Sequence, residues 1–596
     1  MIRSSAGGHW FRQELGGIHL QFMATHRIKH HNQMILPDNA GQGKSQIFVQ
    51  AGILAAASIV VRIIGLLYQS PLTAIIGDEG NGYYSLAYNI YTIVLLISSY
   101  SIPSAISKLM AEKLAMGEYR NAQRIFRAAL WYVLAAGAAG SAVLYFGAGL
   151  LVGPGSVPVL RVFAPTIFLF GLLGALRGYF QAHSTMLQTS VSQIIEQIVN
   201  AAMSLLLAYV LMRRAAGAGS TTQAVYGASG SALGTGSGVL AALLFMLWVY
   251  SMNRRGIRTR MERDTTGTEE PYRKILWEVI CVVTPFVLSS FILNLTTSLN
   301  QTIYTKILMA GRGMDEIGIT VHYGIFSRKA TVITNIPISI ATATSAAVIP
   351  SISGSFARGD GEETLHRARQ AVMMTALVAI PCTVALIFLA KPVTMILFPQ
   401  MDSLNEASAL LALLAVTVFF YSISTITNAV LQATKHMNLP LVSAVAALAV
   451  QTAVLVLLLV RTNMGTYALV AASVIYSVMI FAANELFLRK YMGPGANLGK
   501  RYAGPVAAAL LMGISSLAVY DAVRFLFARA LHFGVAGQAV RILYFANLAA
   551  FLPAFVTAVL VYAFALVKMR VLDEEMIRSM PKGNHLVRVL QRLRWM

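Results

Sequence analysis

The stretch LVSAVAALAVQTAVLVLLLV, residues 441–460, decides the fold class because it contains no charged side chain. About 20 apolar residues are needed for a helix to cross a hydrocarbon core of about 30 Å. Inside that core every backbone N–H and C=O must be paired, either within a helix or within a closed barrel. Barrel strands alternate apolar and polar residues. This stretch does not alternate, so it predicts a membrane-spanning helix.

The rest of the chain has the same character. Of its 596 residues 57% are hydrophobic and 12% are charged, and the mean hydropathy is +0.65. Soluble domains are about 25% charged, so a soluble globular protein is excluded. Apolar runs of spanning length recur and predict an all-α membrane protein with about fourteen transmembrane helices. The expected spans lie near 46–68, 83–105, 128–150, 157–176, 188–212, 224–251, 275–300, 317–350, 370–390, 404–431, 441–460, 466–488, 502–521 and 542–567.

The basic residues predict the orientation, because cytoplasmic loops retain Lys and Arg. With these spans, 33 of the 46 Lys and Arg residues fall in the two terminal tails and the loops on the same side, and 9 fall in the other loops. We therefore expect cytoplasmic N- and C-termini in a multi-pass protein of the cell membrane. The net charge of +22 then reflects topology and attraction to anionic membrane lipids, and no nucleic-acid partner is expected. Residues 1–45 lack the apolar segment of a signal peptide and are expected to be a disordered basic tail.

Two pairs of similar segments indicate an internal repeat. The first pair is IPSAISKLMAEKLAMGEYRNAQRIFR (102–127) and IPSISGSFARGDGEETLHRAR (349–369), and the second is ALRGYFQAHSTM (175–186) and ITNAVLQATKHM (426–437). Spans one to six therefore resemble spans seven to twelve. Because each unit has an even number of spans, two parallel six-helix repeats are expected, with a transport path between them. The predicted units are the tail 1–45, a lobe 46–251, a linker 252–274, a lobe 275–490, two extra helices in 491–567 and a basic cytoplasmic tail 568–596.

Charged residues within spans are the first candidates for function. A charge at the bilayer centre costs at least about 2.5–3.5 kcal/mol and usually faces a cavity or a partner. Arg62, Arg328 and Lys329 meet this criterion and are the candidate substrate-binding cations. Arg62 lies near one end of its span, so extension of its side chain to the membrane surface is the alternative. Arg328 and Lys329 are adjacent and must point in different directions on a helix, so at least one is expected to line a cavity.

Polar residues within spans form a second candidate set. Glu196 and Asn200 share one helix face at i, i+4, which predicts either a polar contact between helices or a site for a coupling ion. Asn294 and Asn300 predict a second polar face, for which helix–helix hydrogen bonding is an equal alternative.

Other motifs indicate packing rather than chemistry. Gly230, Gly234 and Gly238 lie four residues apart, as in helices that approach closely, and this reading is favoured over a dinucleotide loop. Cys281 and Cys382 lie in apolar segments without metal-ligand or redox spacing. No Ser-His-Asp set, metal cluster or carboxylate pair has catalytic spacing. The sequence therefore predicts no enzyme activity, no cofactor and no metal site.

GDEGNGYYSLAYNIYTIVLLISSYSIPSAISKLMAE (77–112) resembles the signature of the stage V sporulation protein B family, within the multidrug/oligosaccharidyl-lipid/polysaccharide exporter superfamily. The resemblance also covers 321–359. It implies a flippase that moves a polyprenyl-pyrophosphate-linked saccharide, a peptidoglycan or polysaccharide precursor, from the cytoplasmic to the outer leaflet by alternating access. Cell-wall synthesis enzymes would be candidate partners.

In the lipid II flippases of this group, arginines line a central cavity. The resemblance assigns Arg62 to the first of these arginines and places Arg328 or Lys329 near another. A second arginine and an aspartate of the pattern are replaced here by Tyr68 and Gln69. The planar guanidinium fork suits phosphate oxygens.

Two other functions remain as alternatives. A cation-coupled multidrug antiporter of the same superfamily would need acidic cavity residues, whereas the charges found within the spans are mostly basic. A membrane-embedded glycosyltransferase would need larger loops outside the membrane to bind its donor substrate, and this reading is the less favoured of the two.

Overall fold

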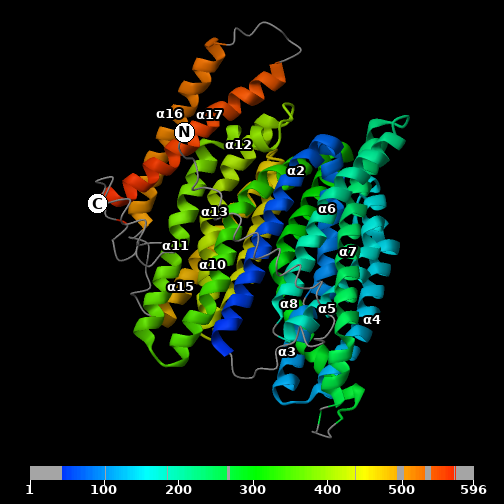
Figure 1. The fold of residues 1–596 in the computed structure, drawn as a ribbon. Coiled ribbons are helices and arrows are strands. Elements are labelled where there is room, and N and C mark those ends of the chain that lie inside the picture. The colour runs from blue at the N-terminus through cyan, green and yellow to red at the C-terminus, as the bar shows by residue number, and fades with distance from the viewer. Residues whose placement is uncertain are drawn as a thin grey trace, which may run out of the picture.

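The computed structural model describes residues 43–100, 102–183, 185–262, 264, 269–436, 438–492, 502–530, 539–569 and 571. Every regular element in these ranges is a helix (Figure 1). The expected tails lie almost wholly outside the described residues, except that 43–45 begin the first helix, 568 ends the last one, and 569 and 571 follow it.

Eleven segments of the described chain are long and apolar enough to cross a membrane. The prediction of a polytopic all-helical membrane protein is therefore confirmed. One of the eleven segments, Val60–Ala115, contains both of the first two predicted spans. The predicted spans at 275–300 and 317–350 form helices that are not among the eleven.

The first half of the chain begins with a long helix that reverses at a glycine. Helix α2 (Gly43–Leu95) is kinked at Gly77, whose φ of 68° is the left-handed conformation that glycine adopts without strain. A π-helical turn, η2 (Leu96–Tyr100), joins it to α3 (Ile102–Ala115). The following helices are α4 (Tyr119–Leu151), η3 (Pro154–Ser156), α5 (Val157–Ala182), α6 (Met186–Arg214) and α7 (Ser220–Glu262).

Helices α6 and α7 make the closest helix pair because of the predicted glycine ladder. A Cβ atom at Gly230 would lie 2.6 Å from the Cα of Ala208, and one at Gly238 would lie 2.5 Å from the carbonyl oxygen of Glu196. A Cβ at Gly234 would overlap the backbone of Ser204. The interpretation of these glycines as a packing surface is therefore confirmed.

The second half begins with α8 (Tyr272–Lys306) and continues with helices that are interrupted twice by π-helical turns. The elements after α8 are η4 (Ile307–Gly311), α9 (Glu316–Gly324), η5 (Ile325–Ala330), α10 (Thr331–Ala357), α11 (Gly361–Phe388), α12 (Ala390–Leu397), α13 (Leu404–Ala433), α14 (Asn438–Arg461) and α15 (Thr466–Met492). The last two helices, α16 (Ala503–Ala530) and α17 (Ala539–Lys568), pair with each other and pack against α11 and α12.

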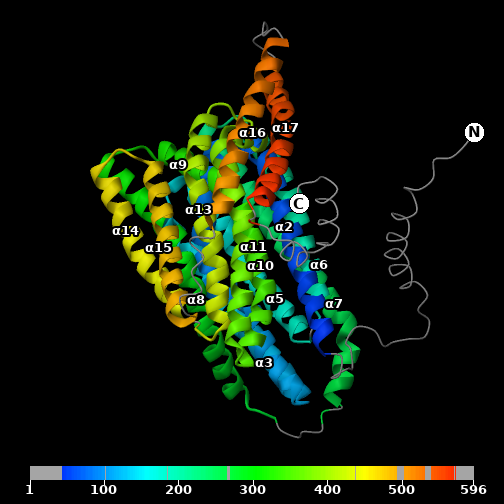
Figure 2. The same cartoon turned by 90° about the vertical axis from the view of Figure 1, so that its left-hand side faces the viewer.

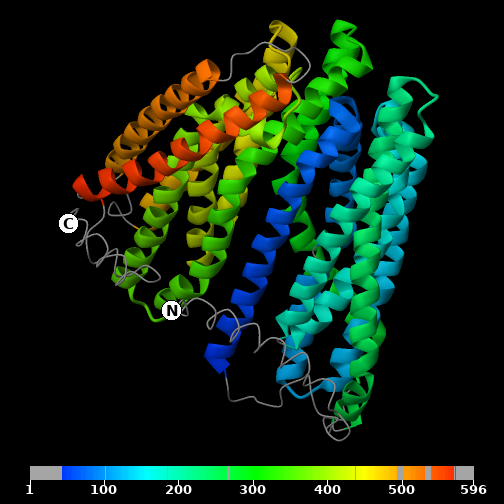
Figure 3. The same ribbon diagram turned by 45° about the horizontal axis from the view of Figure 1, so that its top comes forward.

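The helices form two groups with α2 between them. Figure 3 shows α4 to α7 on one side of α2 and α10 to α15 on the other, with α16 and α17 outside the second group. Figure 2, turned by 90°, shows the same outer position of α16 and α17.

Helix α8 belongs to both groups. Ile275, Val279 and Val283 near its start lie in the apolar core formed by α3, α4, α5 and α7. Tyr304, near its end, lies in a core with residues of α9, α14 and α15.

The predicted polar linker 252–274 is partly helical, since α7 continues to Glu262. Its buried Ile257 anchors this extension to the first group. After this helical extension, Glu270 of the linker forms an ion pair with Lys113, whose Nζ lies 2.9 Å from Glu270 Oε1. The hydrogen bond from Lys113 lowers the pKa of the Glu270 carboxyl group.

Candidate functional site

The two halves of the chain meet at the start of segment 77–112, the segment whose sequence carries the family resemblance. A Cβ on Gly324 of α9 would lie 2.7 Å from the carbonyl oxygen of Asp78, and a Cβ on Gly82 would overlap the backbone of Thr320. Only glycine at these positions lets the main chains of α2 and α9 touch. We call this end of the bundle, uppermost in Figure 1, the Gly77 end.

A buried ion pair closes the same end. Lys329 of η5 is 1% exposed, and its Nζ lies 2.6 Å from Asp78 Oδ1 of α2. The ammonium group also donates to Ser403 Oγ at 2.6 Å. Lys329 is thus neutralised here and joins the two halves.

Hydrogen bonds continue this interface along α2. Ser327 of η5 donates to Ser85 at 2.8 Å. Asn89 donates to Gln301 of α8 at 2.6 Å and to the hydroxyl of Tyr323 at 2.8 Å. The Gly77 end is therefore closed by main-chain contact, an ion pair and buried polar contacts over three turns of α2.

Arg328, next to Lys329, points elsewhere, as the sequence predicted for adjacent cations. Its guanidinium carbon lies 4.6 Å from the centre of the Tyr84 ring of α2. Its Nε and Nη2 are buried without a hydrogen-bond acceptor. Within the described chain no carboxylate pairs with it, so its charge is available to an anion.

Arg62 lies on the first half of α2, and its side chain is exposed. Its Nη1 donates to the hydroxyl of Ser339 on α10. Eleven residues separate Ser339 from Arg328, which corresponds to about 16 Å along a helix. Arg62 and Arg328 thus come from opposite halves and lie at different depths: Arg62 contacts α10 from the arm of α2 before Gly77, and Arg328 contacts Tyr84 on the arm after it.

Glu196 pairs with Arg177, which lies one residue beyond the predicted span 157–176. Arg177 lies inside α5, 7% exposed, and its Nη2 is 2.7 Å from Glu196 Oε2. Its Nε also donates to Ser192 at 2.9 Å. The carboxylate is thus already neutralised on one side. Asn200 accepts from Ser204 at 3.0 Å and faces the glycines of α7, which places it in a helix–helix contact.

The second predicted polar face is likewise engaged in packing where it is described. Asn300 of α8 and Gln451 of α14 pair through their amides, with Gln451 Nε2 donating to Asn300 Oδ1 at 2.8 Å. The side chain of Asn294 lies outside the described residues.

A large apolar groove runs between α10, α11 and α17. Its volume is about 610 Å³. Ile336 and Pro337 of α10, Phe551 and Phe555 of α17 are among its lining residues. Ser339, the partner of Arg62, follows Pro337 by two residues, so the groove and Arg62 lie at neighbouring levels of α10.

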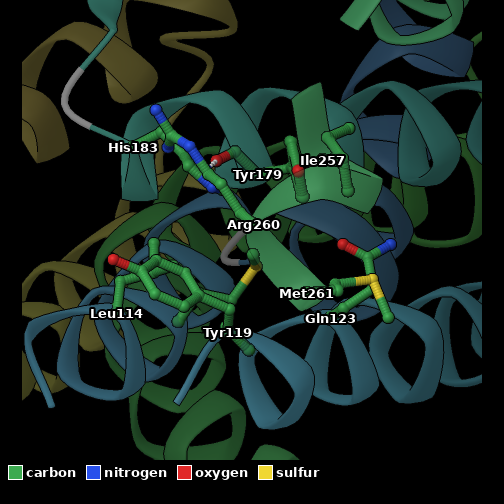
Figure 4. Close-up of a pocket in the computed structure, with 10 residues that line it drawn as sticks. Leu114, Tyr119, Gln123, Tyr179, His183, Ile257, Arg260 and Met261 are labelled. Carbon is green, nitrogen blue, oxygen red and sulfur yellow. Dashed lines mark hydrogen bonds between the residues drawn. The ribbon is translucent and has the colours of Figure 1, made fainter. Parts of the chain in front are cut away.

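A small pocket lies at the opposite end of the first group, below α5 and α7. Figure 4 shows Tyr179, His183 and Arg260 around it. Burial lowers the pKa of His183 to about 4, so this imidazole is neutral at physiological pH. The volume of about 10 Å³ suffices for roughly one water molecule, so it is not a substrate site. In the described chain, no group of three or more His, Cys, Asp or Glu residues could hold a metal ion.

Two groups of membrane helices, closed against each other at one end and bearing arginines that have no carboxylate partner in the described chain, define a multi-pass membrane protein of the transporter class. A family model described as "Polysaccharide biosynthesis protein" matches residues 49–356, and the chain belongs to this family. A second model, MatE, matches residues 328–458.

Individual relatives agree with this assignment. The chain is 26% identical over 411 residues to the lipid II flippase MurJ of Bacillus subtilis, covering 66% of this chain and 74% of that protein. It is 22% identical over 541 residues to stage V sporulation protein B of Bacillus subtilis, covering 90% and 98%. A solved structure of lipid II flippase MurJ in an inward closed conformation has a TM-score of 0.61 at 14% identity, covering 87% and 98%. An outward-facing multidrug resistance MATE transporter has a TM-score of 0.54 at 16% identity, covering 76% and 98%.

Proposed function

We propose that this protein is a flippase that moves a polyprenyl-pyrophosphate-linked saccharide from the cytoplasmic to the outer leaflet by alternating access. The observation that carries the proposal is the pair of unneutralised arginines, Arg62 and Arg328, on the two segments where the halves meet. A pyrophosphate cannot cross hydrocarbon unaccompanied, and guanidinium groups bind phosphate oxygens bidentately. The separation of about 16 Å along the helix between Arg328 and Ser339, the partner of Arg62, suits successive positions of the pyrophosphate during crossing. Lys329 holds the Gly77 end closed rather than binding substrate in this conformation.

The apolar groove supports a lipid-linked substrate. A polyprenyl chain is apolar throughout, and a groove of about 610 Å³ at a neighbouring level of α10 to Arg62 would hold part of it while the head group lies between α2 and α10. A lateral opening between these two helices would let the head group enter while the chain stays in lipid. The relatives named as lipid II flippase and sporulation protein are consistent with this substrate class.

The proposal includes fourteen spans: twelve in two parallel six-helix repeats, the lobes 46–251 and 275–490, and two extra C-terminal helices. The helix pairings of the first half recur in the second, which supports this arrangement. The pairs α2–α6, α3–α5 and α4–α5 correspond to α8–α14, α10–α13 and α11–α13. The pairs α5–α7 and α6–α7 correspond to α13–α15 and α14–α15. The remaining units are the linker 252–274, the two helices of 491–567 and the basic tails 1–45 and 568–596.

The charge distribution supports cytoplasmic termini, with the Gly77 end outside. Arg177 is one of the 33 Lys and Arg residues counted on the cytoplasmic side, but it lies inside helix α5. Leaving it out changes the imbalance of 33 against 9 by only one residue. Cysteine labelling from outside tests the orientation. An introduced cysteine at Glu79 is expected to react in an open state, and reaction at Arg258 from outside would contradict it.

A multidrug antiporter is the second candidate, favoured by the MatE match at 328–458. A cationic drug needs an unpaired carboxylate, however, and Glu196 is bound to Arg177. Transport of a cationic dye by the reconstituted protein, with no movement of lipid-linked saccharide, would favour this candidate. An enzyme such as a glycosyltransferase has no supporting feature in the described chain.

Reconstitution into proteoliposomes tests the flippase directly. The appearance of a polyprenyl-pyrophosphoryl saccharide in the outer leaflet would be followed with a membrane-impermeant sugar-modifying reagent. Arg62→Ala is expected to abolish flipping, and Arg62→Lys to reduce it partly because the charge remains but the fork is lost. Arg161→Ala is the matched control, since Arg161 contacts the ring of Tyr145, away from the interface between the halves.

Membrane insertion should not be impaired in the alanine variants, because removing a charge from within a span lowers the cost of insertion. The outcome that contradicts the proposal is near-normal flipping when Arg62, Arg328 and Lys329 are all replaced by Ala.

A further inference from the structure

Four aromatic rings form a cluster beside Arg328. Tyr84, Tyr88 and Tyr91 of α2 are spaced i, i+4 and i+7 and therefore share one helix face. Phe163 of α5 contacts all three, at ring-centre distances of 5.4, 5.9 and 4.7 Å. Tyr84 and Tyr91 are 2% and 3% exposed, whereas Tyr88 is 37% exposed. The other rings thus hold Tyr88 in place and leave part of its ring accessible.

The accessible ring lies close to the phosphate-binding cation. The rings of Tyr84 and Tyr88 are nearly parallel, 12° apart, with centres separated by 5.6 Å. Because Arg328 Cζ is 4.6 Å from the Tyr84 centre, it lies no farther than about 10 Å from the Tyr88 centre. The group next to a phosphate held at Arg328 would therefore be within reach of Tyr88.

A carboxylate with a free acceptor completes the surroundings. Glu196 lies on α6, which packs against α2, and its charge acts on both Tyr88 and Tyr91. Its Oε2 is bound to Arg177, while Oε1 accepts no hydrogen bond from the described chain. A carboxylate oxygen accepts hydrogen bonds from hydroxyl groups.

An accessible aromatic ring and a carboxylate acceptor together match a pyranose, which has an apolar C–H face and hydroxyl groups at its edge. We infer that Tyr88 and Glu196 form a saccharide subsite, in which the first sugar stacks on Tyr88 while Arg328 holds the adjoining phosphate. The inference rests on the proposed flippase function and adds to it the group that recognises the sugar. A cationic ligand is disfavoured at this place by the charge of Arg328.

The experiment compares two lipids on the full-length protein in nanodiscs: a polyprenyl-pyrophosphoryl monosaccharide and the same polyprenyl pyrophosphate without the sugar. Tyr88→Ala is expected to weaken binding of the sugar-bearing lipid about fivefold to tenfold, from the typical strength of a ring contact. Binding of the sugar-free lipid should stay within about twofold of wild type. Tyr88→Phe and Tyr88→Trp keep a ring and should bind both lipids as wild type does.

Two further variants keep the test interpretable. Tyr88→Leu retains apolar packing without a ring and should reproduce the sugar-selective loss if Tyr88→Ala proves unstable. Tyr226→Ala removes a comparably exposed tyrosine of α7 (46% exposed) and should change neither affinity.

Equal weakening of both lipids, or of neither, in Tyr88→Ala and Tyr88→Leu would overturn the saccharide subsite while leaving the flippase intact. A wild-type protein that binds neither lipid would instead overturn the proposed function itself. Displacement of the sugar-bearing lipid by a cationic drug whose affinity depends on Tyr88 would assign the ring to a drug site.

Discussion

Breaking the Asp78–Lys329 ion pair should open the Gly77 end. Lys329 is 1% exposed and lies 2.6 Å from the carboxylate, so Asp78→Asn removes the carboxylate that neutralises a buried ammonium. Removing one member of a buried pair costs about 3–5 kcal/mol. Opening admits water to Lys329 and relieves that cost, so the ratio of open to closed protein should rise by about a hundredfold to a few thousandfold.

The assay is thiol labelling at the closed interface. Ser85 is 3% exposed, so Ser85→Cys, in a background where Cys281 and Cys382 are replaced by Ser, should label slowly. Adding Asp78→Asn should accelerate labelling.

The double variant Asp78→Asn with Lys329→Gln removes both charges and is the control. It should label nearly as slowly as the charged pair, because no unpaired charge remains buried. Labelling that is unaffected by Asp78→Asn, or that is equally fast in the double variant, would refute the view that the ion pair stabilises closure.

Two further predictions concern stability. Gly234→Ala should lower the free energy of unfolding by about 1–3 kcal/mol, because its Cβ would overlap the Ser204 backbone. The control is Gly256→Ala on the same helix, where a Cβ would meet open space. In the same thermal unfolding assay this control should be neutral or stabilising. His183 has a folded-state pKa of about 4, below its usual 6.5. As the pH falls, this imidazole is therefore protonated in the unfolded chain before it is protonated in the folded protein. The free energy of unfolding should fall as the pH drops from 6.5 towards 4, by at most about 1.4 kcal/mol per pH unit. Melting curves at pH 7 and pH 5 should show this slope in the wild type and a smaller one in His183→Gln, whereas an equal slope in both would contradict the assignment.

The membrane fold was predictable because its signal is local. Apolar runs of spanning length, and glycines spaced four residues apart, carry their meaning within one helix, and the structure bears out both. The divergence of Arg328 and Lys329 was predictable for the same reason, since adjacent residues on any helix point in different directions.

The partners of the charged residues were not predictable, because tertiary packing supplies them. Asp78 lies in what hydropathy presents as an outer loop, and nothing nearby in the sequence indicates Lys329 as its counter-ion. Arg177 directly follows the predicted span 157–176, so hydropathy places it in a loop, although it lies inside helix α5. Its partner Glu196 is 19 positions away on the next helix. Pairing intramembrane acids with arginines at the ends of neighbouring spans would have suggested this contact.

The main-chain contact at Gly82 and Gly324 has a consequence for the energised cell. A membrane potential does about 2.3 kcal/mol of work on each unit charge per 100 mV, so any continuous file of water through the protein would dissipate it as ion leak. Two backbones that touch leave no room for such a file between α2 and α9, and the neighbouring ion pair carries no net charge for the field to pull. A side chain at either glycine would separate the backbones, so its first cost to the cell would be the loss of electrical insulation, even where translocation continued.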